Sequence, residues 1–261
     1  MNEETLPVIV ITGAPTWAED VRQALGAGYI VTRYDTLAGY GTRLVDDRPA
    51  LILVDGDAEG WRFWTATAKA SPATRRIPVA LVASDKVVRA AALISGADLT
   101  FTPDGLLSGA KQIVRDYARV ADPAQITRLE CECEEALPEL ARQGVVKFNK
   151  GEYYKQHDLF EALWVKTDGP VRDLYRAILQ VGVAYYQITR GNSRGALKML
   201  LRSVQWLAIL PDECQDVDVK QLREDSYRVR AALETLEPAG DFDLSLLKPV
   251  QLRGSADENR D

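Results

Sequence analysis

The first part of the chain alternates short, uninterrupted apolar runs with stretches of helical periodicity. A strand that helices cover on both faces is apolar at nearly every position, so these runs predict strands of a parallel sheet. Their alternation with helices is typical of a doubly wound α/β fold, whose ligands bind at the carboxyl ends of the strands. We predict strands over residues 8–11, 29–32, 51–54, 79–82 and 99–101, and helices over 17–25 and 105–119.

The second part of the chain carries helical patterns without the strand alternation. Gly, Pro and Asn separate these patterns, as expected of helix ends. A weak repeat at an offset of 40 residues aligns Gly151 with Gly191 and Phe160 with Leu200. Such spacing favours TPR-like helix pairs that form a compact all-α bundle. We predict helices over residues 148–164, 171–189, 194–209 and 217–236.

Prolines between these two parts indicate the expected domain boundaries. Pro123 and the residues before it interrupt the chain, and Pro138 interrupts an acidic helical stretch that follows. Periodicity fades after residue 237. The prediction is an α/β domain, a helical linker, an all-α domain and an extended or disordered tail, over residues 1–121, 122–143, 144–237 and 238–261 respectively.

Charge and cysteine content limit the classes of function. The formal net charge of −6 and the pI of about 5.1 argue against a general nucleic-acid or anionic-membrane binder. Neither a signal peptide nor an apolar run long enough for a bilayer is expected, which favours a cytoplasmic protein. The cysteines Cys131, Cys133 and Cys214 are accompanied by a single histidine, so we expect reduced, structural thiols and no zinc site.

Three passages in the α/β part resemble response-regulator receivers. They are residues 48–55 (RPALILVD), 77–82 (IPVALV) and 96–98 (GAD), in the order and spacing of that family. The resemblance covers the whole first domain. It implies a flavodoxin-like sheet with Asp55 at the phospho-acceptor position. It also implies Mg²⁺ held by further carboxylates, since this hard cation prefers oxygen ligands.

The other groups that phosphoryl transfer requires are replaced. Where the family has an acidic pair after the first strand, residues 12–14 read Thr-Gly-Ala. Ala83 stands at the hydroxyl position with Ser84 beside it, and Thr102 stands at the lysine position. These groups would otherwise hold the metal and the phosphoryl oxygens. The sequence therefore predicts a receiver that cannot be phosphorylated.

Two interpretations of Asp55 remain. Asp57 or Asp85 could lie close enough to rebuild part of a cation site. The interpretation that we favour is a strand-end carboxylate hydrogen-bonded to nearby loop amides. The resemblance then implies a domain kept for docking or dimerisation.

The all-α part is similar to the helical family known as Domain of Unknown Function 309. The resemblance covers most of that part, with one departure at Asp158, where the family more often has Glu. Members have been labelled predicted metal-dependent hydrolases. The matching positions are Phe148, Asn149, Gly151, Tyr153, Tyr154, His157, Asp158, Glu161, Trp164, Arg172, Gln180, residues 184–186 and residues 190–192, 195 and 196.

One helix in this part concentrates the candidate site residues. At about 100° per residue, Tyr153, His157, Phe160 and Trp164 fall on one stripe, flanked by Glu161. We favour a buried polar network in which Glu161, Arg172 or Gln180 satisfies the histidine. A ligand pocket without catalysis is a second interpretation. The candidate set for either is Tyr153, His157, Asp158, Glu161, Trp164, Arg172 and Gln180.

A metal site is the third interpretation of the same helix. His157 and Glu161 are four residues apart and could share a cation, with Asp158 as a weaker ligand. A hydrolytic zinc site usually has three protein ligands and an open position, which this pair does not supply alone. We therefore predict no metal ligand and no catalytic residue, and no cofactor.

The function that these features favour is a non-catalytic regulatory or scaffold protein. Its receiver-like and helical domains would mediate protein interactions with an unidentified partner or in a homodimer, with no nucleic acid or membrane as partner. The alternative is a metal-dependent hydrolase around His157 and Glu161. A basic edge at Arg190, Arg194, Lys198 and Arg202 is expected to be a solvated face that an acidic partner could use.

Overall fold

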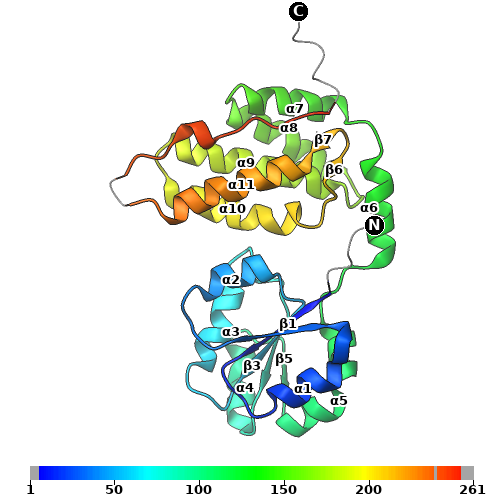
Figure 1. Ribbon diagram of the computed structural model, residues 1–261, viewed down its shortest axis with the longest axis vertical. Coiled ribbons are helices and arrows are strands. Elements are labelled where there is room, and N and C mark those ends of the chain that lie inside the picture. The colour runs from blue at the N-terminus through cyan, green and yellow to red at the C-terminus, as the bar shows by residue number, and fades with distance from the viewer. Residues whose placement is uncertain (1–5, 238–239, 254–261) are drawn as a thin grey trace, which may run out of the picture. The chain divides into compact units, whose positions relative to one another are not determined.

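The computed structural model describes residues 6–237 and 240–253. The chain divides into two compact units, Met1–Val120 and Ala121–Asp261, and each is described by itself (Figure 1). We call them the α/β unit and the helical unit. Among the described residues, no helix has both the length and the apolarity needed to cross a bilayer.

A five-stranded parallel sheet forms the centre of the α/β unit. Its strands lie in the order β2-β1-β3-β4-β5, which is the flavodoxin-like order of doubly wound folds. The predicted fold class is thus confirmed, and β2 differs from the prediction mainly by continuing two residues further. The strands are β1 (Val8–Thr12), β2 (Ile30–Tyr34), β3 (Leu51–Asp55), β4 (Val79–Val82) and β5 (Leu99–Phe101).

Helices cover both faces of this sheet because successive strand residues point to opposite sides. Ile9 and Ile11 pack with residues of α1 (Ala18–Leu25) and α5 (Pro103–Tyr117). Val10 packs on the other face with residues of the three remaining helices. Figure 1 shows the two layers on either side of the sheet. Those helices are α2 (Tyr40–Asp47), α3 (Trp61–Ala70) and α4 (Lys86–Ile94), and a short 3₁₀ turn, η1 (Gly26–Gly28), follows α1.

The helical unit packs consecutive helices against one another around a single core. α9 lies between α8 and α10, and α11 packs on α10. A hairpin of two-residue strands precedes α11; strands this short leave no periodicity in the sequence. The elements are α6 (Pro123–Cys133), α7 (Glu139–Asn149), α8 (Tyr153–Lys166), α9 (Arg172–Thr189), α10 (Ser193–Leu207), β6 (Glu213–Cys214), β7 (Val217–Asp218), α11 (Val219–Glu234) and η2 (Leu244–Leu246).

The segment predicted as a linker, residues 122–143, is built into the helical unit. It forms α6 and the start of α7, and Pro138 precedes α7. Leu129, Leu137 and Ala141 are buried in the same core as the later helices. These residues therefore belong to the helical unit and not to a linker outside it, because their apolar side chains contribute to its core.

The chain after α11 runs in an extended path on the helical unit. Val250 is buried, and its backbone N–H donates to Asn149 Oδ1 at 2.8 Å while Asn149 Nδ2 donates back to Val250 O at 2.9 Å. Leu252 forms a β-bridge with Val217. Residues 254–261, which we predicted to be disordered, lie outside the described residues.

The weak sequence repeat corresponds to two turns of the same geometry. Gly151 follows α7 and Gly191 follows α9, with φ of 73° and 72°. Each glycine N–H donates at 2.9 Å to a carbonyl three residues earlier, on Phe148 and Ile188. Glycine adopts this left-handed conformation without a side-chain penalty. The helix predicted to begin at residue 148 therefore begins only at Tyr153, while the TPR-like pairing stays a prediction.

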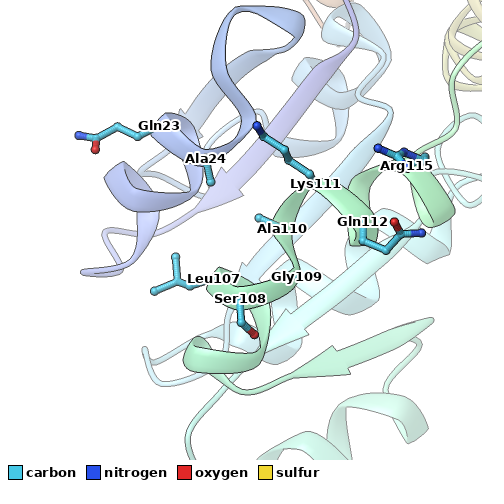
Figure 2. A pocket seen from close by; sticks show the side chains of 9 residues that line it. All are labelled: Gln23, Ala24, Leu107, Ser108, Gly109, Ala110, Lys111, Gln112 and Arg115. Atoms are coloured by element: carbon cyan, nitrogen blue, oxygen red, sulfur yellow. The ribbon is translucent and has the colours of Figure 1, made fainter.

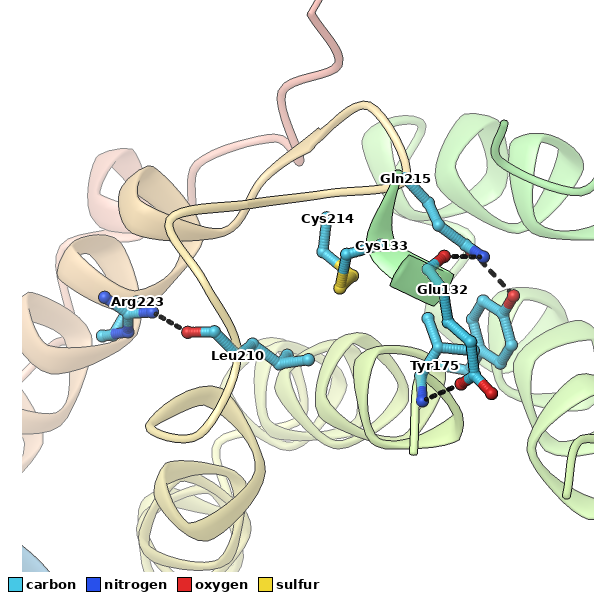
Figure 3. Close-up of a disulfide and its surroundings, with 8 residues drawn as sticks. Glu132, Cys133, Tyr175, Leu210, Cys214, Gln215 and Arg223 are labelled. Atoms are coloured by element: carbon cyan, nitrogen blue, oxygen red, sulfur yellow. Dashed lines mark hydrogen bonds between the residues drawn. A yellow bond between two sulfur atoms is a disulfide. The ribbon is translucent and has the colours of Figure 1, made fainter. Parts of the chain in front are cut away.

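Two of the cysteines form a disulfide bond (Figure 3). Cys133 at the end of α6 is joined to Cys214 in β6, 81 residues further along the chain. The prediction of reduced thiols is wrong for this pair, because sequence spacing does not indicate which distant residues meet in the fold. Cys131 is exposed and free.

Candidate functional site

Asp55 is the last residue of β3, at the carboxyl edge of the sheet, and its side chain is buried. Its Oδ1 accepts a hydrogen bond from Asp57 N at 3.1 Å, and its own N–H donates to Thr12 Oγ1 at 3.3 Å. Burial raises the pKa of the Asp55 carboxyl, and the nearby Asp57 charge adds to this rise, while hydrogen bonds from the Asp57 and Ala58 amides partly offset it. This carboxyl is thus held by loop amides, as the favoured interpretation has it.

The groups nearest to Asp55 have structural partners of their own. The Asp57 carboxylate accepts from Ser84 N at 2.9 Å and from Ser84 Oγ at 2.9 Å. Asp85 caps α4 by accepting from Val87 N, at 2.7 Å. Both aspartates that could have rebuilt a cation site are therefore engaged in ordering the loop after β4.

The other strand-end positions singled out in the sequence carry neutral side chains. Thr12 and Ala83 are fully buried, and Thr102 Oγ1 caps α5 by accepting from Gly105 N at 3.0 Å. Gly13 has a φ of 74°, which favours glycine at the end of β1. Across the described ranges, no group of three or more His, Cys, Asp or Glu side chains could hold a metal ion.

Tyr153, the first candidate in the helical unit, is an aromatic core residue. Its ring packs edge-on against Phe148 and Tyr185, with centroids 5.4 and 5.8 Å apart. Burial raises the pKa of its hydroxyl. Tyr153 therefore stabilises the contact between α8 and its neighbours by packing.

His157 lies on α8 with about a third of its side chain exposed. Its Nδ1 is 3.3 Å from Asp158 Oδ1, on the adjacent and more exposed residue. Glu161 is exposed, and no hydrogen bond or ion pair of its side chain occurs within the described residues. Asp158, a member of the candidate set, is therefore the polar group that the structure places beside His157, and the network with Glu161, Arg172 or Gln180 stays a prediction.

Trp164 and Arg172 lie close together, but the residue that they share as a neighbour is Arg176 and not His157. Arg172 Cζ lies 5.7 Å from the centroid of the Trp164 ring, and Arg176 Cζ lies 4.6 Å from it. Arg176 also lies 3.9 Å from the ring centroid of Trp206, so its guanidinium contacts two indole rings. Such cation–π contacts are attractive because the ring face is electronegative. The sequence reasoning missed Arg176, for which the four-residue spacing from Arg172 on α9 was the available signal.

Polar atoms are buried nearby without partners among the described residues. These atoms are Trp164 Nε1 and Gln180 Oε1. Gln156, which sequence reasoning did not single out, is fully buried; its Nε2 donates weakly to Leu179 O at 3.4 Å and its Oε1 has no described partner. The fully buried polar residue of α8 is therefore Gln156 and not His157.

A shallow pocket of about 490 Å³ lies on the α/β unit between α1 and α5 (Figure 2). Gln23 and Ala24 line it from α1, and residues 107–112 with Arg115 line it from α5. None of the predicted site residues lines this pocket. Its polar lining is that of an open surface depression between two helices.

The class of protein defined by this geometry is a doubly wound α/β unit with a lone strand-end aspartate, followed by an all-helical unit. Residues 141–199, which lie in the helical unit, match the model of the family described as "Domain of unknown function (DUF309)". This confirms the resemblance found in the sequence.

Two individual proteins show lower similarity. An "Uncharacterized protein" of Aquifex aeolicus (strain VF5) is 20% identical over 86 residues, which cover 33% of this chain and 26% of that protein. The match thus spans about a quarter of the length of this curated relative. The crystal structure of a "putative response regulator" from Chloroflexus aurantiacus J-10-fl is 17% identical, with a TM-score of 0.36, over 42% of this chain and 99% of that one.

Proposed function

We propose that this chain is a regulatory or scaffold protein whose two units bind other proteins, and whose receiver-like α/β unit works without phosphorylation. The observation that carries the proposal is the surroundings of Asp55. The positions that would hold a cation and the phosphoryl oxygens are occupied by Thr12, Ala83 and Thr102, which are neutral.

Phosphoryl transfer to an aspartate needs positive charge beside the carboxylate, because charge on the phosphoryl oxygens must be stabilised as the bond forms. Among the described residues, no basic side chain makes a hydrogen bond or an ion pair with Asp55. Its raised pKa also reflects an environment that disfavours the charged nucleophile. The hydroxyl of Ser84, the nearest substitute for the missing threonine or serine, donates to Asp57.

A surface for protein contact on the α/β unit is the outer side of α4. Val87 is 74% exposed and Ile94 is 91% exposed, and Ala90 lies between them one helical turn from each. Apolar side chains grouped this way on a soluble surface mark interaction sites. The occupant that we propose is the same face of a second copy, which makes the protein a homodimer.

The helical unit offers a charged surface for a different partner. Arg194, Lys198 and Arg202 recur every fourth residue along α10, and Arg190 precedes them at the end of α9. None of the four has a carboxylate partner within the described parts of the chain. In a protein of net charge −6, such a stripe favours an acidic protein segment as the ligand.

The phosphorylation part of the proposal is tested by intact mass spectrometry. The protein is incubated with Mg²⁺ and acetyl phosphate, or with Mg²⁺ and beryllofluoride, and compared with Asp55→Asn. We expect no adduct in either protein. A phosphoryl or beryllofluoride adduct on the wild type that Asp55→Asn lacks contradicts the proposal.

The dimer part is tested by sedimentation of Val87→Glu/Ile94→Glu. We expect the variant to be monomeric at concentrations where the wild type is dimeric, because the two introduced carboxylates of each copy would be buried at the interface. Val165→Glu, at an exposed apolar position of α8, is the matched control and should leave the dimer unchanged. A wild type that is monomeric at high concentration contradicts this part.

The hydrolase alternative around His157 and Glu161 stays a prediction. The described contacts add no third ligand to that pair, and His157 lies toward Asp158.

A further inference from the structure

The Cys133–Cys214 disulfide joins α6, a helix with few buried residues, to the β6–β7 hairpin. Cys133 is the last residue of α6, and Cys214 belongs to β6 of the hairpin. Cys214 is fully buried and Cys133 is 9% exposed. The bond therefore fastens the end of α6 to a distant part of the helical unit.

A small hydrogen-bond network surrounds the bond (Figure 3). Gln215 N donates to Cys133 O at 2.7 Å, and Gln215 Nε2 donates to Glu132 O at 3.2 Å. Tyr175 OH donates to Gln215 Oε1 at 2.8 Å, and Val171 N donates to Glu132 Oε2 at 2.9 Å. Three of these hydrogen bonds involve Glu132 or Cys133 in the final turn of α6, and the Tyr175 bond holds the Gln215 side chain that contacts this turn.

The rest of α6 is held weakly. Of its eleven residues, only Leu129 and Cys133 are buried. Segments with few buried apolar contacts open at low free-energy cost, well below that of global unfolding. With the disulfide removed, one apolar side chain and the last-turn hydrogen bonds would keep α6 in place.

We propose that Cys133–Cys214 is a reversible thiol–disulfide exchange site, and that a dithiol reductant releases α6 from the helical unit. This goes beyond the proposed function and does not depend on it. The site takes a small-molecule or protein dithiol as its co-substrate, and the class of reaction is two-electron exchange without a metal or other cofactor.

The exchange proceeds in two balanced displacements. A thiolate of the dithiol attacks Sγ of Cys133, which belongs to the less buried of the two residues, and the Sγ–Sγ bond breaks with Cys214 leaving as a thiolate that takes up a proton. The second thiolate of the dithiol then attacks the mixed disulfide and releases the Cys133 thiolate, which is protonated. The protein disulfide gains two electrons and two protons, and the dithiol becomes a disulfide.

Release of α6 changes the connection between the two units. The helical unit begins at Ala121 and α6 begins at Pro123, so a fastened α6 leaves a very short connecting segment. With α6 released, that segment extends to the residue before Leu137, which is buried in the core of the helical unit just ahead of α7. The redox state of one bond thereby sets the length of the chain that joins the units.

The first test counts thiols in the full-length protein. Cells are lysed in an alkylating agent, and the protein is purified and denatured. Its intact mass is measured by mass spectrometry before reduction, and again after reduction and renewed alkylation. We expect one alkylated cysteine, Cys131, before reduction, and the two bonded cysteines to become reactive only afterwards. Cys131→Ser should show none before reduction. Three alkylated cysteines in protein purified from cells held under oxidant overturn the proposal.

The second test measures hydrogen exchange in α6 and α9 with and without dithiothreitol. We expect reduction to let the α6 amides exchange by local opening, at least about tenfold faster than before and with rates that change little in low denaturant. The α9 amides should still exchange only through unfolding of the whole helical unit, so their rates rise with denaturant concentration. Trypsin should then cut after Arg128 in the reduced protein only. Cys131→Ser is the control and should behave as wild type. Unchanged α6 exchange, or α6 and α9 rates with the same denaturant dependence after reduction, overturns local release.

Two further variants show whether the changes in α6 arise from the disulfide or from misfolding. Cys133→Ala/Cys214→Ala should resemble the reduced wild type and no longer respond to dithiothreitol. Gln215→Ala keeps the disulfide and removes the side-chain hydrogen bonds to Glu132 O in the final turn and to Tyr175 OH. It should exchange slowly in α6 while oxidised and faster than the wild type when reduced. Equal α6 rates in its two redox states contradict the fastening role of the bond.

Discussion

Asp55 combines a buried carboxyl with hydrogen bonds from loop amides, and its protonation is linked to stability. Because burial raises the pKa of this carboxyl above its unfolded value, its stabilising contribution is complete below the unfolded pKa. That contribution is lost as pH rises through the folded pKa. Above the folded pKa, the charged carboxyl therefore opposes folding.

Asp55→Asn is accordingly expected to be more stable than wild type at neutral pH, by up to about 1 kcal/mol. The advantage should vanish below about pH 4, where the unfolded carboxyl is also protonated. Urea unfolding across this pH range measures both values. Asp85→Asn, which retains a cap on α4, is the control. A loss of stability in Asp55→Asn at neutral pH would mean that the carboxylate has a cationic partner after all.

How far the sequence predicts individual site residues is visible at Gln156 and His157. Helical periodicity gave a stripe that contains Tyr153, His157 and Phe160, on the assumption that α8 buries one face. α8 packs against both α7 and α9, so the buried positions also include Gln156, at a three-residue spacing from Tyr153. A pattern that assumes one buried face cannot tell which of these positions is buried. The neutral side chains around Asp55, in contrast, could be predicted directly from the residues at the ends of the neighbouring strands.

Among the elements, the strands were predictable because burial on both faces makes their sequences continuously apolar. The β6–β7 hairpin and the docking of α6 were not, since both depend on residues far apart in the chain meeting in the fold. Arg176 illustrates the same limit, because its two indole partners come from α8 and α10. Local pattern thus predicts elements, and tertiary contacts decide which side chains they bring together.

The close approach of α7 to α8 depends on Gly144. A Cβ at this position would lie 2.6 Å from Cε2 of Phe160, a ring that is fully buried and cannot move aside. We expect Gly144→Ala to destabilise the helical unit by about 1–3 kcal/mol, because the helices must separate.

Urea unfolding measures the loss, and a Phe160→Leu background should reduce it since the clash is removed. Gly41→Ala in α2 is the control, because a Cβ there meets nothing within 4 Å. That control should be neutral or more stable by up to about 1 kcal/mol, as alanine is the better helix former. Equal effects of Gly144→Ala in both backgrounds would contradict the packing argument.

The two units of the full chain differ in what stabilises them. The α/β unit rests on a sheet covered on both faces, whereas the helical unit adds a covalent bond across 81 residues. Closing a loop of this length restricts the unfolded chain, which on the loop-entropy model stabilises the folded state by about 4 kcal/mol. Only the unit that contains the loop gains from it.

Reduction of the full-length protein is therefore expected to lower the free energy of unfolding of the helical unit by about 4 kcal/mol and to leave the α/β unit unchanged. Hydrogen exchange in increasing denaturant separates the two, with amides of β1 and β3 reporting on one unit and amides of α9 on the other. Cys131→Ser should respond to reductant as the wild type does, since it retains the Cys133–Cys214 disulfide. Equal destabilisation of β1, β3 and α9 would contradict the expectation, because it would mean that the two units unfold as one cooperative body.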